Sequence, residues 1–149
     1  MATTVDIVIP VLNEEVALPL CIEKLMAFTS DYPERDWRIV VADNGSTDRT
    51  TDIASEFSDR HSNIILSRLE QRGRGRALKK AWGESDADVR LYMDVDLSTN
   101  LQSLSPLVTA IAEDGYEVAI GSRLTKNSEV VDRSVKREIT SRGYNILIH

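Results

Sequence analysis

The sequence predicts an α/β domain in which helices flank a mostly parallel sheet. Short apolar runs rich in β-branched residues alternate along the chain with segments whose apolar residues recur at helical spacing. Several of these runs are apolar at successive positions, which is typical of strands buried on both faces of a parallel sheet. A length of 149 residues corresponds to a single domain.

The first half of the chain is expected to supply three strands, each followed by a helix. Asn13 is a suitable N-cap for the first helix, and Glu14 and Glu15 suit its first turn. A turn at Asn44-Gly45 precedes the second helix. The expected strands cover residues 5–11, 38–43 and 63–69, and the helices run from the Asn13 cap to about residue 29, over residues 48–60, and from the glycine-rich loop 71–76 to about residue 82.

The second half of the chain begins with an apolar strand, residues 89–94, that ends at acidic side chains. A helix follows from Ser105-Pro106 to about Gly115, because proline suits a first turn and glycine a C-cap. The expected elements after it are a fifth strand at residues 117–121, a loop at residues 124–132 and a helix at residues 134–149.

Composition narrows the range of functions. The apolar fraction of 42% and the charged fraction of 28% are those of an ordinary globular protein, and the net charge of −6 argues against general nucleic-acid binding. The single cysteine, Cys21, excludes an intrachain disulfide and is expected to be a buried thiol. The sequence shows no signal peptide and no apolar stretch near the ~20 residues that span a bilayer, so a cytoplasmic location is expected.

The strand at residues 89–94 ends at Asp94, and Asp96 lies two positions further on, so the two side chains project to the same side of an extended chain. Two neighbouring carboxylates stay ionised when a cation lies between them or when water reaches them. Mg²⁺ or Mn²⁺ prefers such oxygen ligands and leaves positions open for the phosphates of a substrate. We therefore expect an Asp-x-Asp metal site for a nucleotide diphosphate, with a solvated strand end as the alternative.

Polar side chains also follow the other predicted strands, at the sheet edge where α/β domains bind ligands. Asp43 can accept hydrogen bonds from a ribose or a base, although a turn-forming role explains it equally well. The arginines of the glycine-rich loop can meet an anion or can simply be solvated, and the loop lacks the Gly-Lys-Ser/Thr of a Walker motif. The residues in question are Asn13 and Glu14, Asp43 and Asn44, Arg72 to Arg76, and Arg123.

Five motifs in this order resemble those of the inverting family 2 glycosyltransferases. The segments Asp96-Leu-Ser-Thr99 and Ser141-Arg-Gly-Tyr-Asn145 are similar to the branch that makes dolichyl- or polyprenyl-phosphate sugars. The resemblance covers nearly the whole chain. The motifs are Ile9-Pro-Val-Leu-Asn-Glu-Glu15, Val41-Ala-Asp-Asn-Gly-Ser-Thr-Asp48, Arg72-Gly-Arg-Gly75, Met93-Asp-Val-Asp-Leu97 and Gly121-Ser-Arg123.

The resemblance implies a GT-A fold that transfers a sugar, with inversion, from a nucleotide sugar to a lipid phosphate. UDP-glucose is the favoured donor and GDP-mannose the alternative. The implied roles are nucleotide-sugar binding by Pro10, Asn13, Glu14, Asp43, Asn44, Arg72, Arg76 and Asp94, metal binding by Asp94 and Asp96, catalysis by Asp94, Asp96 and Arg123, and acceptor-phosphate binding by Arg123, Arg137 and Ser141.

The sequence departs from the family pattern in three places. Asp43-Asn44 replaces the more usual pair of acids, and Thr99-Asn100 replaces the common His/Asp-Pro. The chain also stops at His149 inside an expected helix, so we expect a C-terminally truncated domain. In this interpretation residues 1–99 are the nucleotide-sugar-binding half and residues 100–149 an incomplete acceptor-side half.

A basic cluster in the last part of the chain fits an anionic acceptor at a membrane surface. Its members, Arg133, Lys136, Arg137 and Arg142, lie in an otherwise acidic protein, and a solvated helix face is the alternative explanation. This favours a peripheral location at the cytoplasmic face of a membrane and leaves the oligomeric state open. Two rival functions remain at this point: a sugar-nucleotide nucleotidyltransferase, and a non-catalytic nucleotide-binding or interaction module.

Overall fold

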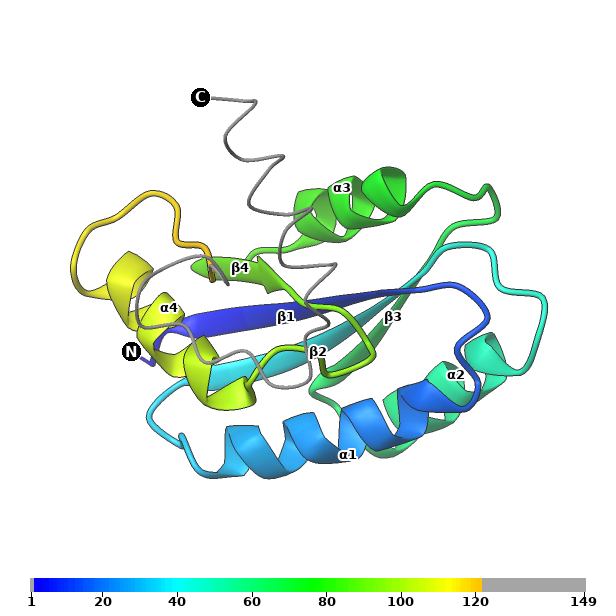
Figure 1. The fold of residues 1–149 in the computed structure, drawn as a ribbon, viewed down its shortest axis with the longest axis horizontal. Coiled ribbons are helices and arrows are strands. Elements are labelled where there is room, and N and C mark those ends of the chain that lie inside the picture. Colours follow the sequence, from blue (N-terminus) through cyan, green and yellow to red (C-terminus); the bar gives the residue numbers. More distant parts are fainter. Residues whose placement is uncertain (1, 122–149) are drawn as a thin grey trace, which may run out of the picture. The chain divides into compact units, whose positions relative to one another are not determined.

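The computed structural model describes residues 2–121, which contain one four-stranded parallel sheet flanked by helices (Figure 1). The strand order is β3-β2-β1-β4, so the first strand of the chain lies inside the sheet. The predicted α/β class is confirmed. The elements are β1 (Thr4–Val11), α1 (Ala17–Ser30), β2 (Asp36–Asp43), α2 (Thr50–Arg60), β3 (Ile64–Arg68), α3 (Arg74–Glu84), β4 (Val89–Tyr92), the 3₁₀ turn η1 (Leu101–Ser103) and α4 (Leu104–Ala112).

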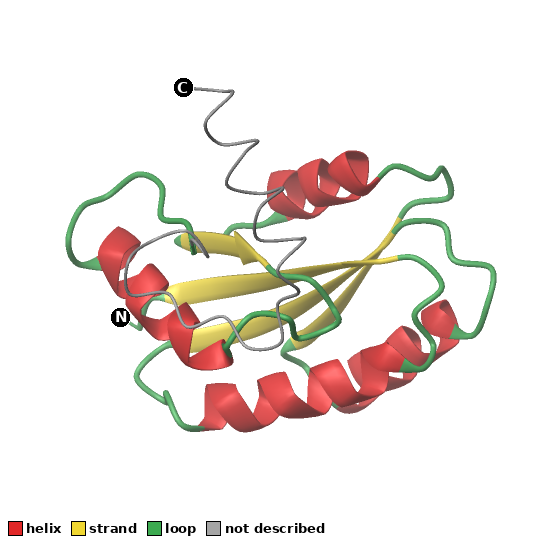
Figure 2. Cartoon of the chain, viewed as in Figure 1, coloured by secondary structure: helices red, strands yellow, loops and turns green. Residues whose placement is uncertain are grey.

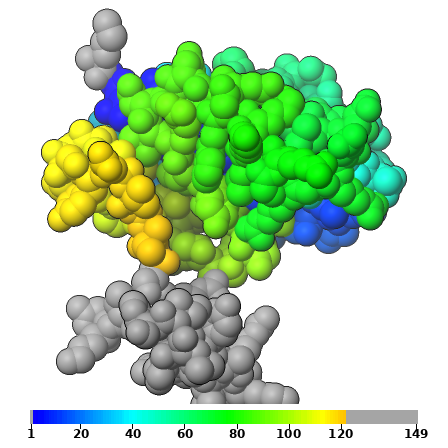
Figure 3. Space-filling model, turned by 90° about the horizontal axis from the view of Figure 1, so that it is seen from above, coloured from blue at the N-terminus to red at the C-terminus, as the bar shows by residue number. Residues whose placement is uncertain are grey.

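Helices cover both faces of the sheet, as Figure 2 shows. Side chains of α1, α2 and α4 pack against alternate residues of β1, including Ile7 and Ile9. On the opposite face, Val8 and Val40 pack against Ala77 and Ala81 of α3. This helix, coloured green, faces the viewer in Figure 3. Because both faces are covered, β1 is buried from Val5 to Ile9, which explains why its sequence is mostly apolar.

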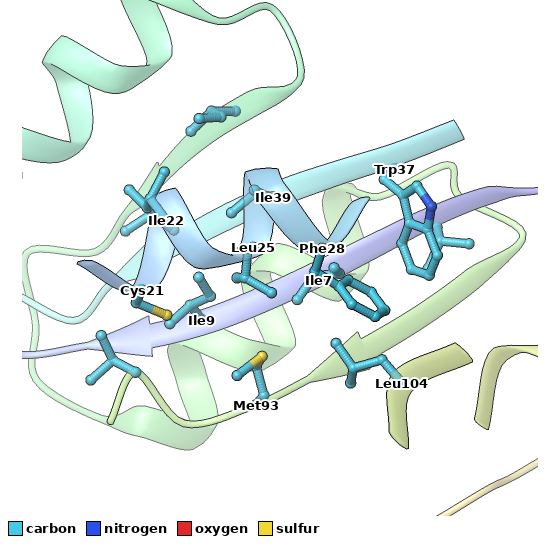
Figure 4. Close-up of a cluster of buried hydrophobic side chains, with 14 of the residues drawn as sticks. Ile7, Ile9, Cys21, Ile22, Leu25, Phe28, Trp37, Ile39, Met93 and Leu104 are labelled. Carbon is cyan, nitrogen blue, oxygen red and sulfur yellow. The ribbon is translucent and has the colours of Figure 1, made fainter. Parts of the chain in front are cut away.

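The core between α1 and the sheet extends to the segment after β4 (Figure 4). Met93 and Leu104 lie in this cluster with Ile9 and Phe28, and all four are at most 5% exposed. Met93 anchors the chain immediately before Asp94, so the core fixes the position at which the acidic motif begins. The cysteine in the same cluster, Cys21, is fully buried, and burial, followed by the charge of Asp96, raises its pKa to about 12. An un-ionised thiol of this kind is a packing residue.

One charged residue, Asp6, is buried within β1 without breaking the strand. Its carboxylate accepts a 2.6 Å hydrogen bond from Nε of Arg38, its partner in register on β2. Arg38 also forms a 2.7 Å ion pair with Asp86, and its hydrogen bond lowers the pKa of Asp86. A buried carboxylate is tolerated when it is paired in this way. The Asp6 carboxylate is therefore accommodated by its ion pair and does not line the pocket described below.

The prediction that Asn13 caps the first helix is wrong. Helix α1 begins at Ala17, and Val16 occupies the N-cap position. Asn13 instead adopts a left-handed conformation with φ of 56°, which asparagine tolerates better than most residues. Its side chain hydrogen-bonds across to the loop after β2, and this distant contact determines the local conformation. Pro19 lies in the first turn of α1, where a missing N–H costs little.

Two strand predictions also need correction. Strand β4 ends at Tyr92, so Asp94 lies two residues beyond it and not at its last position. Residues 117–121 form no strand, and Val118 and Ile120 are 77% and 80% exposed. The short apolar run at residues 118–120 resembles a strand, but a strand also needs a neighbouring backbone to pair with, and the described residues supply none beside this segment. The first compact unit of the chain, Met1–Ala119, ends within it.

Candidate functional site

The carboxyl ends of β1, β2 and β4 lie together, because the three strands are parallel and adjacent in register. Beyond them lies an open pocket of about 410 Å³. Its lining joins residues that are far apart in the sequence. The lining residues are Pro10, Val11, Leu12, Glu14, Asn44, Arg74, Asp94, Val95 and Asp96.

Asp94 and Asp96 both line this pocket, as the two-residue spacing predicted. The segment still alternates after β4 has ended: Met93 and Val95 are buried, whereas both aspartates are exposed. Oδ1 of Asp96 accepts a 2.9 Å hydrogen bond from the backbone N–H of Ser98. Leu97, which lies between Asp96 and Ser98, has a positive φ of 54°, so the chain turns sharply directly after the acids.

The donor atoms of the pocket can be compared with the needs of the expected divalent cation. The Asp94 side chain is 51% exposed, and carboxylate oxygens are the ligands that Mg²⁺ and Mn²⁺ prefer. Within residues 2–121 no cluster of three or more His, Cys, Asp or Glu side chains has the arrangement of a metal site. Mg²⁺ is commonly held by one or two carboxylates together with substrate phosphates and water. The two carboxylates therefore suit a divalent cation only as part of a larger set of ligands.

Asp43 is fully buried and is not part of the pocket lining. Its two oxygens accept hydrogen bonds from the backbone N–H of Ser46 at 2.9 Å and from the hydroxyl of Thr51 at 2.5 Å. These bonds give it the turn-forming role that the sequence left open. The next residue, Asn44, does line the pocket, and its Oδ1 accepts from the N–H of Gly73, which joins the end of β2 to the glycine-rich loop.

Glu14 lines the pocket on a loop that is clamped to the loop after β2. Its backbone N–H donates to the Thr50 hydroxyl at 2.8 Å. Oδ1 of Asn13 accepts from the N–H of Thr47 at 2.8 Å, and Oε2 of Glu15 accepts from the N–H of Arg49 at 3.0 Å. The two loops thus hold one another, and Asn13 acts in this clamp, outside the lining of the pocket.

Of the three arginines in the glycine-rich loop, Arg74 is the one that reaches the pocket. It forms an ion pair with Asp94, and its guanidinium carbon lies 5.7 Å from the centre of the Tyr92 ring. Arg76 donates instead to Gln71 at 3.1 Å, and neither Arg72 nor Arg76 lines the pocket. The sequence pattern placed all three near the site, and the family resemblance assigned nucleotide-sugar binding to Arg72 and Arg76, which stays a prediction. The start of α3 at Arg74 is the feature that distinguishes it.

The predicted residues Arg123, Arg137 and Ser141 lie outside the described residues, as do the predicted loop at residues 124–132 and helix at residues 134–149. Within the described part of the chain, no helix combines the length and apolar character needed to cross a membrane.

Solved structures similar to this chain share both its fold and part of its sequence. A mannosyltransferase from Pyrobaculum calidifontis, PcManGT, in complex with GDP-Man and Mn²⁺, is 28% identical with a TM-score of 0.57, and the match covers 76% of this chain and 33% of that one. S. aureus TarS, residues 1–349, is 25% identical with a TM-score of 0.60, and the match covers 74% of this chain and 33% of that one.

Curated relatives align with almost the whole chain. Glycosyltransferase AglD of Haloferax volcanii is 33% identical, over 97% of this chain and 23% of its own length. Dolichyl-phosphate beta-glucosyltransferase ALG5D of Trichomonas vaginalis is 29% identical, over 97% of this chain and 47% of its own length. Dolichol-phosphate mannosyltransferase of Pyrococcus furiosus is 30% identical, over 93% of this chain and 38% of its own length. This chain spans less than half the length of each of these relatives.

The family described as Glycosyl transferase family 2 matches residues 6–148, which is nearly the whole chain. The matched region includes every strand of the sheet except the first residues of β1, and all the residues that line the pocket. The GT-A-like fold agrees with this match. The chain therefore belongs to glycosyl transferase family 2.

Proposed function

We propose that the chain is the nucleotide-sugar-binding part of an inverting glycosyltransferase that moves a sugar onto a polyprenyl or dolichyl phosphate. The observation that carries the proposal is the pocket at the carboxyl ends of the strands. It joins two exposed carboxylates, Asp94 and Asp96, to Arg74, Glu14 and Asn44. These groups supply metal ligands, a cation for phosphate, and hydrogen-bonding groups for a nucleoside.

In this proposal the donor's diphosphate lies beside Asp94 and Asp96, and the nucleoside lies against Pro10, Glu14 and Asn44. A divalent cation held by the two aspartates would neutralise the charge that develops on the departing nucleotide diphosphate. Arg74 lies close enough to Asp94 to share this task. Asp43 holds the turn after β2 and Asn13 holds the contact between the two loops, and both remain proposed nucleotide-sugar-binding residues. Arg72 and Arg76 remain proposed donor-binding residues on the same loop.

The acceptor side rests on the relatives' chemistry and on the predicted residues beyond residue 121. A phosphate monoester has a second pKa near 6, so it is mostly ionised at neutral pH and needs little help from a general base. Arg123, Arg137 and Ser141 are proposed to bind this phosphate, with Arg123 assisting catalysis. A lipid phosphate would place the protein at a membrane surface, and we propose the cytoplasmic face because nucleotide sugars are water-soluble donors.

Two of the relatives are named for different sugars, a glucosyltransferase and a mannosyltransferase. We keep UDP-glucose as the proposed donor and GDP-mannose as the alternative. The cation is proposed to be Mg²⁺ or Mn²⁺, and the Pyrobaculum neighbour that holds GDP-Man together with Mn²⁺ supports this choice.

Calorimetric titration of the chain with UDP, GDP and nucleoside triphosphates, with and without Mn²⁺, tests the proposal. We expect one nucleoside diphosphate to bind, and to bind only when Mn²⁺ is present. Binding of a triphosphate with a sugar phosphate, and of no diphosphate, would point to a nucleotidyltransferase. Absence of any nucleotide binding would point to an interaction module, and either result would contradict the proposal.

A further inference from the structure

Arg74 contacts two different groups at the pocket. Its guanidinium forms an ion pair with Oδ1 of Asp94 and lies over the ring of Tyr92, with 5.7 Å from the guanidinium carbon to the ring centre. The Arg74 and Asp94 side chains are 55% and 51% exposed, so water screens their attraction. Exposed pairs of this kind contribute little to stability and separate at small cost.

The same Asp94 carboxylate is one of the two that a divalent cation would use. An oxygen that is hydrogen-bonded to a guanidinium is less available to a metal, and the nearby positive charge repels one. Arg74 is also the first residue of α3, an eleven-residue helix whose N-terminal N–H groups favour an anion. The arginine therefore lies between a carboxylate that needs a cation and the position where a diphosphate would meet the helix.

We propose that Arg74 is an exchangeable counter-ion: it neutralises Asp94 in the empty pocket and transfers to the donor's diphosphate when a metal occupies the aspartates. This inference rests on the proposed function, and it adds an exchange with Asp94 to the anion contact that the sequence offered for the arginines of this loop. The Tyr92 ring supplies a second contact that keeps the guanidinium beside the pocket during the exchange, since cations are attracted to the face of an aromatic ring.

The exchange predicts that removing Arg74 has opposite effects on two affinities. Mn²⁺ binding without nucleotide is measured by electron paramagnetic resonance in the wild-type chain and in the Arg74→Ala variant. The variant should bind Mn²⁺ about two- to fivefold more tightly, because the competing ion pair is gone. A Lys79→Ala variant, which removes an exposed positive charge from the same helix, is the matched control and should change Mn²⁺ affinity little.

The second affinity is that for the nucleoside diphosphate at saturating Mn²⁺, measured by calorimetry. Arg74→Ala should weaken it by about tenfold or more, because a charge-assisted hydrogen bond to phosphate is lost. Circular dichroism of both variants checks that the fold is intact.

Each outcome of these measurements decides the proposal. Unchanged or weaker Mn²⁺ binding in Arg74→Ala, an equal gain in Lys79→Ala, or no Mn²⁺ binding by either protein would overturn the exchange. Tighter Mn²⁺ binding with an unchanged nucleotide affinity would overturn the transfer to the diphosphate. If no nucleotide binds to either protein, the proposed function fails, while the Mn²⁺ measurement still decides whether Arg74 competes for Asp94.

Discussion

Gly45 shows how a single residue shapes the pocket. It has a positive φ of 80° and forms the turn that directly follows Asn44. A Cβ atom at this position would lie 2.9 Å from the carbonyl oxygen of Glu70, closer than ordinary contact allows. Both the backbone conformation and the available space therefore require glycine here.

Replacing Gly45 with alanine should lower the free energy of unfolding by about 1–3 kcal/mol, because it combines left-handed strain with a backbone clash. Gly83→Ala is the control: Gly83 is a helical residue of α3 whose added Cβ would meet nothing within 4 Å. That change should stabilise the protein by about 0.5–1 kcal/mol. Urea denaturation of both variants checks the prediction, and equal effects at the two positions would contradict it.

Asp48 links the fold to pH at the residue scale. Desolvation raises the pKa of Asp48. The hydrogen bonds that it accepts from the hydroxyl and N–H of Thr50 and from the N–H of Glu15 together lower the pKa by more, so the net pKa lies below the ordinary 3.8. A depressed folded-state pKa gives a stability contribution that is complete above the unfolded pKa. The contribution is lost as the pH falls through the folded value.

The Asp48→Asn variant should therefore show a weaker dependence of unfolding free energy on pH below about pH 4 than the wild-type chain. Asparagine cannot be protonated in this range, so the part of the slope due to residue 48 disappears, whatever the absolute stability of the variant. Acid titrations at several urea concentrations measure the slope. An identical slope in the two proteins would show that Asp48 does not contribute.

At the scale of elements, the loops after β1 and β2 form one unit. The Thr50 hydroxyl, which is fully buried at the start of α2, accepts from the N–H of Glu14 at 2.8 Å and donates to Asp48 at 2.5 Å. Sequence distance hides this contact, because residues 14 and 50 belong to different βα units. The clamp explains why Glu14 can line the pocket from a loop that contains no regular structure.

Thr50→Val keeps the shape of the side chain but removes the hydroxyl, which leaves the Glu14 N–H without its partner. We expect a loss of about 1–3 kcal/mol in unfolding free energy and faster amide hydrogen exchange at Glu14. Thr29→Val serves as the control, because the Thr29 hydroxyl donates only to Met26 within its own helix. Unchanged exchange at Glu14 in Thr50→Val would mean that the loop is held by other contacts.

The elements predicted correctly are those whose signal is local. The four strands of the sheet contain apolar runs, and their helices repeat apolar residues at the spacing that one buried face requires. The prediction failed where distant contacts decide. Asn13 was expected to cap a helix but hydrogen-bonds to Thr47, and residues 117–121 have the pattern of a strand without a partner beside them.

The same distinction applies to the site. The spacing of Asp94 and Asp96 is a local signal, and both residues do line the pocket. The arginines of the glycine-rich loop alternate with glycines, so the sequence alone could not show which one faces the acids. The start of α3 selects Arg74, and the contact of Asn44 with Gly73 fixes the loop beside it. Asp43 was ambiguous in sequence; its buried hydrogen bonds fit the turn-forming role, and its nucleotide-sugar-binding role stays a prediction.

At the scale of the whole molecule, four parallel strands bring together, at one edge of the sheet, side chains from the segments that follow each of them. The central claim is that this edge binds a diphosphate through a metal held by Asp94 and Asp96. The claim requires nucleotide affinity and metal concentration to be linked, and it requires the link to depend on these carboxylates. Asp96→Ala removes one of them, and Asp59→Ala removes an exposed acid of α2 outside the pocket lining.

Calorimetric titration of UDP and GDP over a range of Mn²⁺ concentrations, in the wild-type chain and in these two variants, tests the claim most directly. We predict that nucleotide affinity rises with Mn²⁺ in the wild type and in Asp59→Ala, and that Asp96→Ala loses this dependence while keeping its fold. Tight, Mn²⁺-dependent binding that persists in Asp96→Ala would contradict the claim.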